Sequence, residues 1–366
     1  MFGIDRRLVQ NFDWMLLGLI ALLACMGIVN LYSATTAAGD PLSDEVRRQL
    51  FSLGLGTAAA LVVAAIDYRH FERLALPAYL VAIGLLVLTL VIAPVTRGSQ
   101  SWLFGGRFQP SELAKVAIVL AVSRYFLRNP PGETRQLRDL FWPVLIVAAP
   151  VGLIVAQRDL GVALLTLLIG GTYFALVRIP WKVWFGIAAL GVAALAALWT
   201  FGLADYQKER ILAVVDPGRD PLASGYQVNQ SRIAIGSGGL TGTGYRRGTQ
   251  TQLRFLPTQH TDFAFSVVAE EWGFLGSSAV LTLYGTLLLW GLVVARSSKD
   301  EFGALLAIGV VGCLFWPAAL NVAMVLGLAP VIGVPLPLFS YGGSALVTTL
   351  ALTGVLLNVS MRRYVF

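Results

Sequence analysis

Ten apolar runs alternate with polar segments along the chain, and each is close to the length of a membrane crossing. A helix needs about 20 apolar residues to cross the roughly 30 Å of hydrocarbon in a bilayer. The runs are Trp14–Tyr32, Leu50–Ile66, Leu74–Ala93, Ser111–Phe126, Leu140–Ala156, Leu160–Val177, Trp181–Phe201, Phe274–Ala295, Phe302–Leu328 and Phe339–Val359. The pattern predicts an all-α polytopic membrane protein with about ten transmembrane helices in a single domain, residues 1–366.

One polar segment, residues 202–262, is much longer than the others. Long segments of this kind in compact proteins are usually functional or disordered. Apolar residues recur at helical spacing after Tyr206 and again over Val228–Ile235, which predicts short amphipathic helices at the membrane surface. Its glycine-rich part, Gly236–Gln250, contains Arg246 and Arg247, so it is either a flexible turn or a cradle for phosphate.

The distribution of basic residues predicts the orientation, because Lys and Arg near helix ends stay on the cytoplasmic side. With the N-terminus inside, the inner segments carry Arg6, Arg7, Arg69, Arg73, Arg124, Arg128, Arg135, Arg138, Arg178, Lys182, Arg296, Lys299, Arg362 and Arg363. Both termini are therefore expected in the cytoplasm and the long loop outside. The net charge of +7 reflects this topology, and the absence of a basic soluble domain argues against a nucleic-acid partner.

The run from Phe263 to Ala295 is too long for one straight crossing, since its 33 residues would span about 50 Å. We expect a break at Gly273, which leaves Phe263–Trp272 as a short outer helix. Asp262 then lies at the start of that helix, where it is either an N-cap or a rigidly positioned base or ligand.

Other ionisable residues flank the outer ends of the predicted spans. Glu112 and Lys115 lie three residues apart on one helix face, either as a structural ion pair or as part of a polar cavity. Asp159 lies at the break between two spans. Further candidates for the cavity are Arg107, Arg246, Arg247, His260 and Glu271. Cations and carboxylates that face outward suit an amphiphile with an anionic headgroup.

Five segments resemble the SEDS (shape, elongation, division and sporulation) family, and the resemblance covers nearly the whole chain. They are FQPSELAK (108–115), QRDLG (157–161), SRIAIGSGGLTGTG (231–244), FLPTQHTDFAFSVVAEEWG (255–273) and PLPLFSYGGSALV (335–347). The segment GTQTQLRFLP (248–257) resembles the elongation branch more than the division branch. Three positions depart from the family pattern: Arg158 replaces proline, Thr258 replaces glutamate, and Ser101 replaces arginine.

The resemblance implies a peptidoglycan glycosyltransferase that polymerises lipid II on the outer face of the bacterial cytoplasmic membrane, with a class B penicillin-binding protein as partner. It implies functional roles for Asp262, Glu112, Lys115 and Asp159. A lipid-linked precursor flippase and a non-catalytic scaffold of the elongation machinery remain alternatives.

For the transferase we hypothesise that Asp262 is the general base, or that it holds a divalent cation such as Mg²⁺. Lys115, Arg107, Arg246 and Arg247 are the candidates to stabilise the leaving pyrophosphate.

Overall fold

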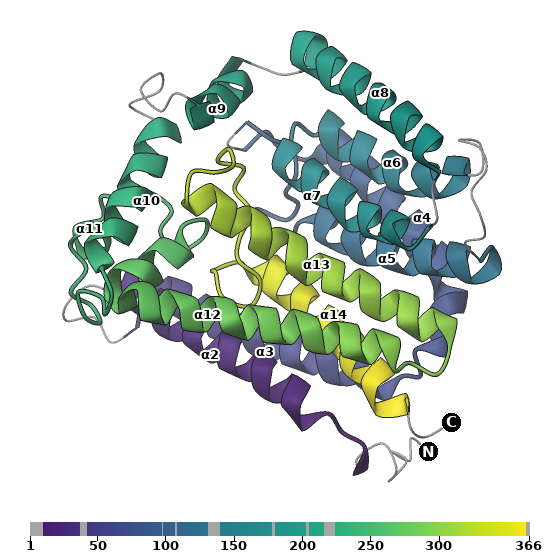
Figure 1. The fold of residues 1–366 in the computed structure, drawn as a ribbon, viewed down its shortest axis with the longest axis horizontal. Coiled ribbons are helices and arrows are strands. Elements are labelled where there is room, and N and C mark those ends of the chain that lie inside the picture. The colour runs from purple at the N-terminus through teal and green to yellow at the C-terminus, as the bar shows by residue number, and fades with distance from the viewer. Residues whose placement is uncertain are drawn as a thin grey trace.

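Helices make up nearly all the regular structure of the chain in the computed structural model, which describes residues 10–36, 42–96, 98–106, 108–130, 140–177, 180–202, 205–215 and 224–363. Long helices run side by side through the molecule, and α9, α10 and α11 gather at one end of this bundle (Figure 1). The described residues form no extended strand, only two isolated bridges. The predicted all-α architecture is confirmed.

Each predicted membrane-spanning run coincides with a helix. The helices are α2 (Trp14–Thr35), α3 (Asp44–Ala65), α4 (Arg69–Ile92), α5 (Pro110–Arg128), α6 (Phe141–Ala156), α7 (Leu160–Gly171) continued by η2 (Thr172–Leu176), α8 (Trp181–Ala197) continued by η3 (Leu198–Gly202), α12 (Ala264–Arg296), α13 (Glu301–Val325) and α14 (Gly343–Arg362). Within the described residues, six of them are long and apolar enough to cross a membrane. The protein is therefore a multi-pass membrane protein.

Helix starts follow local capping chemistry. Asp13, Ser43, Asp159 and Asp300 each accept a hydrogen bond from a backbone N–H in the first turn of the helix that follows them. Pro110 opens α5, at a position where a missing backbone N–H has no cost.

The predicted break at Gly273 is confirmed. This residue has φ 65° and ψ −159° inside α12, a conformation that is essentially restricted to glycine. It divides α12 into a short helix, 264–272, and a membrane-crossing part. Every residue from Ala264 to Glu271 is buried, so the short helix lies inside the protein.

The long segment that was predicted to lie outside, residues 202–262, is named the outer segment after that prediction. It contains α9 (Asp205–Val215), α10 (Ser224–Gly238) and α11 (Thr249–Gln252), which confirms that short helices occur in it. Helix α10 packs against the buried short helix: the Ser231 hydroxyl donates to the Val325 carbonyl at 2.7 Å and contacts the Ser266 hydroxyl at 2.9 Å. Gly238 allows a close approach, because a Cβ there would lie 1.9 Å from the Ala269 carbonyl oxygen.

The two ends of the bundle differ in character. At one end the start of α2 meets the end of α14, where Ser360 donates a hydrogen bond to the Asp13 carboxylate at 2.5 Å. At the other end lie Thr36, the loop before α5, the α6–α7 break and the loop between α13 and α14. The second end carries the candidate site, so the site and the two termini of the helical bundle lie at opposite ends of α2.

Candidate functional site

Asp262 lies just before the buried short helix of α12. It is half-buried, as are His260 and Thr261 before it, whereas the residues from Phe263 to Glu271 are buried. The N-cap of that helix is Phe263, one residue later than predicted, because the helix begins at Ala264. The backbone N–H of Asp262 donates to the Thr258 carbonyl at 3.2 Å, as part of a tight turn in which Thr258 itself has φ 50°.

Two buried asparagines hold the backbone around Asp262. Asn321 of α13 donates to the Asp262 carbonyl at 2.7 Å, and Asn30 of α2 donates to the Ala264 carbonyl at 3.0 Å. The sequence analysis missed both residues, since each lies within an apolar run and its partner is more than fifty residues away. A polar residue inside a membrane-spanning run was the signal that could have indicated them.

The predicted pair of Glu112 and Lys115 is confirmed as an ion pair, with 2.8 Å between the Lys115 Nζ and a Glu112 carboxylate oxygen. Both side chains are buried. A buried carboxylate and a buried ammonium are each costly unless paired, and here each is the partner of the other. The nearby Ser111 hydroxyl is buried and has no hydrogen-bond partner among the described residues.

Asp159 belongs to the same cluster. One of its carboxylate oxygens accepts from the Val162 N–H at 3.2 Å, and the other accepts from the Gln109 side chain at 3.4 Å. Burial raises the pKa of this carboxyl above its ordinary value, while the bonds from Val162 and Ser101 and the charge of Lys115 oppose the shift. Ser101, which departs from the family pattern, is thus a buried neighbour of Asp159.

The loop between α13 and α14 connects this cluster to Asp262. Gly161, in the first turn of α7, packs so closely on the loop that a Cβ there would lie 2.3 Å from the Ile332 carbonyl oxygen. The next loop residue, Gly333, adjoins Asp262: its Cβ would lie 3.7 Å from the Asp262 Oδ2. Neighbouring residues of one loop thus approach Gly161, two residues after Asp159, and the Asp262 carboxylate.

The carboxylates that follow Asp262 in sequence hold the outer segment. Glu270 is fully buried, and its two oxygens accept from the backbone N–H groups of Gln250 and Thr251 at 2.8 and 3.0 Å and from the Thr251 hydroxyl at 2.7 Å. Glu271 is also buried and accepts from the Ser33 hydroxyl of α2. Both are internal residues, so neither is solvated at the membrane surface.

Of the arginines predicted near the site, Arg246 lies against the end of α2. Its guanidinium donates to the Thr36 carbonyl at 2.9 Å and lies 5.3 Å from the centre of the Tyr32 ring. A cation there complements the C-terminal end of the helix dipole. Arg247 is exposed, and Arg107 lies outside the described residues.

His260 joins the turn before Asp262 to the start of α14. Its carbonyl accepts from the Tyr341 N–H at 2.9 Å, and the two rings lie 5.7 Å apart. The described residues contain no group of three or more His, Cys, Asp or Glu side chains that could hold a metal ion.

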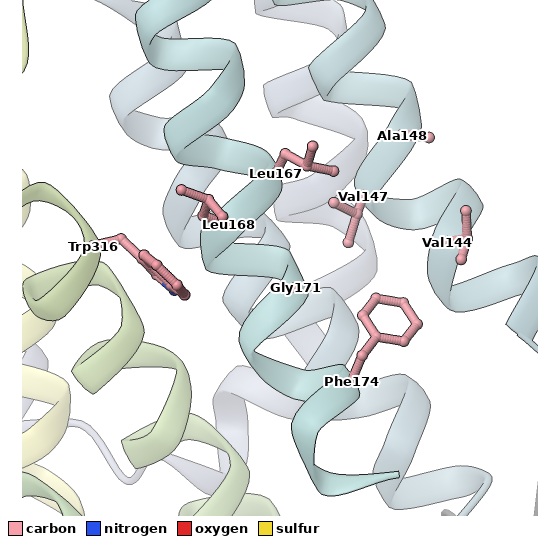
Figure 2. A pocket seen from close by; sticks show the side chains of 8 residues that line it. All are labelled: Val144, Val147, Ala148, Leu167, Leu168, Gly171, Phe174 and Trp316. Atoms are coloured by element: carbon pink, nitrogen blue, oxygen red, sulfur yellow. The ribbon is translucent and has the colours of Figure 1, made fainter. Parts of the chain in front are cut away.

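An apolar cavity of about 330 Å³ lies away from these charges, between α6, α7, η2 and α13. Figure 2 shows its aliphatic and aromatic lining, with Val147 and Phe174 on one side and Trp316 on the other. It offers hydrocarbon contact and no acid or base, so we do not assign the chemistry to it.

Comparison with known proteins identifies the family of the chain. The family model of the FtsW, RodA and SpoVE cell cycle proteins matches residues 13–365, nearly the whole chain. The chain belongs to this family. The peptidoglycan glycosyltransferase MrdB of Escherichia coli (strain K12) is 40% identical over 95% of this chain and 93% of its own. The probable peptidoglycan glycosyltransferase FtsW of Geobacter sp. (strain M18) is 36% identical over 97% of this chain and 98% of its own.

Solved structures agree with the FtsW/RodA/SpoVE assignment. A chain of a peptidoglycan synthase complex, solved to show how polymerization and crosslinking are coordinated, matches with a TM-score of 0.82 and 36% identity over 97% of this chain and 99% of its own. The rod shape determining protein RodA of Thermus thermophilus matches with a TM-score of 0.71 and 33% identity over 96% of this chain and 98% of its own. The resemblance found in the sequence motifs is confirmed.

Proposed function

We propose that this protein is a peptidoglycan glycosyltransferase that polymerises lipid II into glycan strands during cell elongation. The relatives named for that activity support the reaction class, and MrdB and RodA support the elongation role. The observation that carries the proposal is that one loop, at Ile332 and Gly333, packs on Gly161, two residues after Asp159, and adjoins the Asp262 carboxylate. The buried ion pair of Glu112 and Lys115 lies near Asp159. A partly exposed carboxylate on the same loop as a polar cluster that includes a fixed cation suits the transfer of a sugar from a lipid pyrophosphate.

In the proposed reaction, the 4-hydroxyl of the acceptor GlcNAc attacks the anomeric carbon of the donor MurNAc, and the bond to undecaprenyl pyrophosphate breaks with inversion from α to β. An alcohol is a weak nucleophile, so a carboxylate that accepts its proton contributes about 10²–10⁴ in rate. Asp262 has this role in our proposal, because a tight turn and two asparagines fix its backbone.

Negative charge develops on the leaving pyrophosphate, and fixed cations stabilise that charge more in the transition state than in the ground state. Lys115 is the described residue best suited to this task, since its ion pair with Glu112 fixes its position. Arg246 is engaged with α2, so we assign it to holding the outer segment in place.

A divalent cation such as Mg²⁺ fits the proposal as a ligand shared with substrate. Mg²⁺ commonly binds one or two carboxylates together with substrate phosphates. Asp262 is the residue that would hold it, and the ion would supply positive charge at the pyrophosphate. A polymerisation rate that chelation leaves unchanged would eliminate this role.

The proposed function includes the orientation of the protein in the membrane and a protein partner. Basic residues Arg69, Arg128, Arg296, Arg362 and Arg363 lie at the end of the bundle with the termini, which supports a cytoplasmic location for that end and an outward-facing site. Likeness to a chain of a complex that couples polymerization to crosslinking supports a class B penicillin-binding protein as partner.

The test is to reconstitute the full chain with its penicillin-binding partner in vesicles, with the transpeptidase blocked, and to supply labelled lipid II. We expect a ladder of glycan polymer on a gel. Transfer of labelled lipid II across the bilayer without polymer would instead identify a flippase. Neither polymer nor transfer, from a complex of confirmed composition, would favour the scaffold.

A further inference from the structure

Asn321 of α13 is fully buried and forms two hydrogen bonds through one amide nitrogen. It donates to the Asp262 carbonyl and to the Val334 carbonyl, each at 2.7 Å. Both partners can only accept, so the nitrogen of this amide must face them, and its orientation is fixed by chemistry.

The two carbonyls belong to different segments that meet at the site. Asp262 precedes the short helix of α12, and Val334 follows Gly333, which adjoins the Asp262 carboxylate. The Asn321 side chain thus links the backbone of Asp262, the candidate base, to the adjacent loop at Val334.

Regular secondary structure does not hold these carbonyls. Asp262 lies outside α12, and residues 330–336 are in neither a helix nor a strand. Buried backbone carbonyls need partners, and here a side chain from a third element supplies them. The Asn321 Oδ1 is buried without a partner among the described residues. The Asn321 amide therefore uses its nitrogen for both hydrogen bonds, while its oxygen has none among the described residues.

We propose that Asn321 is a positioning residue for Asp262, and this inference rests on the proposed function. A base must lie within about 2.6–3.2 Å of the group that loses its proton, and a displacement of about 1 Å lowers rates by about 10²-fold. Loss of the amide would free both segments, so it should impair turnover rather than lipid II binding.

The chain provides a matched control in Asn358 of α14. It is also fully buried, and its amide nitrogen also donates to two backbone carbonyls, those of Val63 at 2.6 Å and of Ile66. It lies at the opposite end of the bundle, beside Arg362. Asn321→Leu and Asn358→Leu therefore remove the same pair of N–H···O=C bonds and differ in their distance from the site. Asn358→Leu also removes an acceptor for the Arg362 guanidinium, so it is the more severe control for fold stability.

The experiment measures initial polymerisation rates against lipid II concentration for the full chain reconstituted with its partner. For Asn321→Leu we expect kcat to fall about 10–100-fold with KM within about 2-fold of wild type. For Asn358→Leu, with an equal or larger loss of thermal stability, we expect kcat within about 3-fold of wild type. Equal kcat losses in the two variants would overturn the inference.

Asn321→Asp tests the same idea without a change in volume. A protonated carboxyl can still donate one hydrogen bond, whereas a carboxylate only accepts. We expect its rate, relative to wild type, to recover as the pH is lowered; a rate equal to wild type at every pH would overturn the inference. A wild-type complex that makes no polymer would overturn the proposed function and this inference with it.

Discussion

Glu112 and Lys115 are buried charges in the candidate site, and their contribution to the stability of the fold can be measured separately from their contribution to the reaction rate. Glu112 and Lys115 form a close, buried ion pair. Such pairs often add little net stability, yet removal of one partner costs about 3–5 kcal/mol because the other charge is left unpaired.

We therefore expect Lys115→Met to destabilise the protein by about 3–5 kcal/mol and to abolish polymerisation. The double variant Glu112→Gln with Lys115→Met should recover most of the stability, since no charge remains unpaired, but none of the activity. Thermal unfolding in detergent and the polymer assay measure the two properties. Recovery of both in the double variant would reduce the pair to a structural role.

The raised pKa of Asp159 predicts how the stability of the protein depends on pH. Burial raises its pKa in the folded protein, so the neutral form favours folding, and stability is lost as the pH rises through that folded pKa. Asp159→Asn stays neutral and can still cap α7. Its melting temperature should match wild type below about pH 4, the ordinary pKa of Asp, and exceed it by an amount that grows as the pH rises through the raised folded pKa. A difference that does not change with pH would contradict this assignment.

At the scale of elements, Gly273 determines the path of the chain. Its backbone conformation divides α12, and this division keeps the short helix and Asp262 inside the bundle. A Cβ at Gly273 would also lie 2.3 Å from the Gly242 nitrogen, so the outer segment depends on the same residue.

Gly273→Ala should destabilise the protein by at least about 1–3 kcal/mol and remove polymerisation. Gly285→Ala is the control in the same helix, because a Cβ there meets no atom within 4 Å. That change should be neutral or stabilising by up to about 1 kcal/mol. Similar effects of the two substitutions on melting temperature and activity would contradict the role given to the break.

The spans and the break could be predicted from the sequence because they depend on local properties: the length of apolar runs and the conformational freedom of glycine. Asp262, Glu112, Lys115 and Asp159 stood out because charge is costly next to apolar runs. Asn321 and Glu270 could not be assigned in this way, since their roles depend on which backbone groups distant segments bring to them. The contact of Arg246 with α2 is likewise a product of tertiary packing.

At the scale of the whole molecule, two groups of polar and charged residues lie at opposite ends of the helical bundle. At the end that holds the termini, Tyr68 donates to Asp300 and Ser360 donates to Asp13, and ion pairs join Arg362 to Asp67 and Arg363 to Asp13. The cluster of Glu112, Lys115 and Asp159 and the residue Asp262 lie at the other end, where the outer helices α9, α10 and α11 gather (Figure 1). This separation suits an enzyme that works on one surface of a membrane, and polymerisation of lipid II is the activity we assign to it.

The most direct test compares glycan polymer made from labelled lipid II by wild type and by Asp262→Ala, each reconstituted with the penicillin-binding partner whose transpeptidase is blocked. The account predicts polymer from wild type and a loss of at least about 10²-fold in the variant, with equal folding and equal binding of the partner. Equal amounts of polymer from the two proteins would contradict a catalytic role for Asp262.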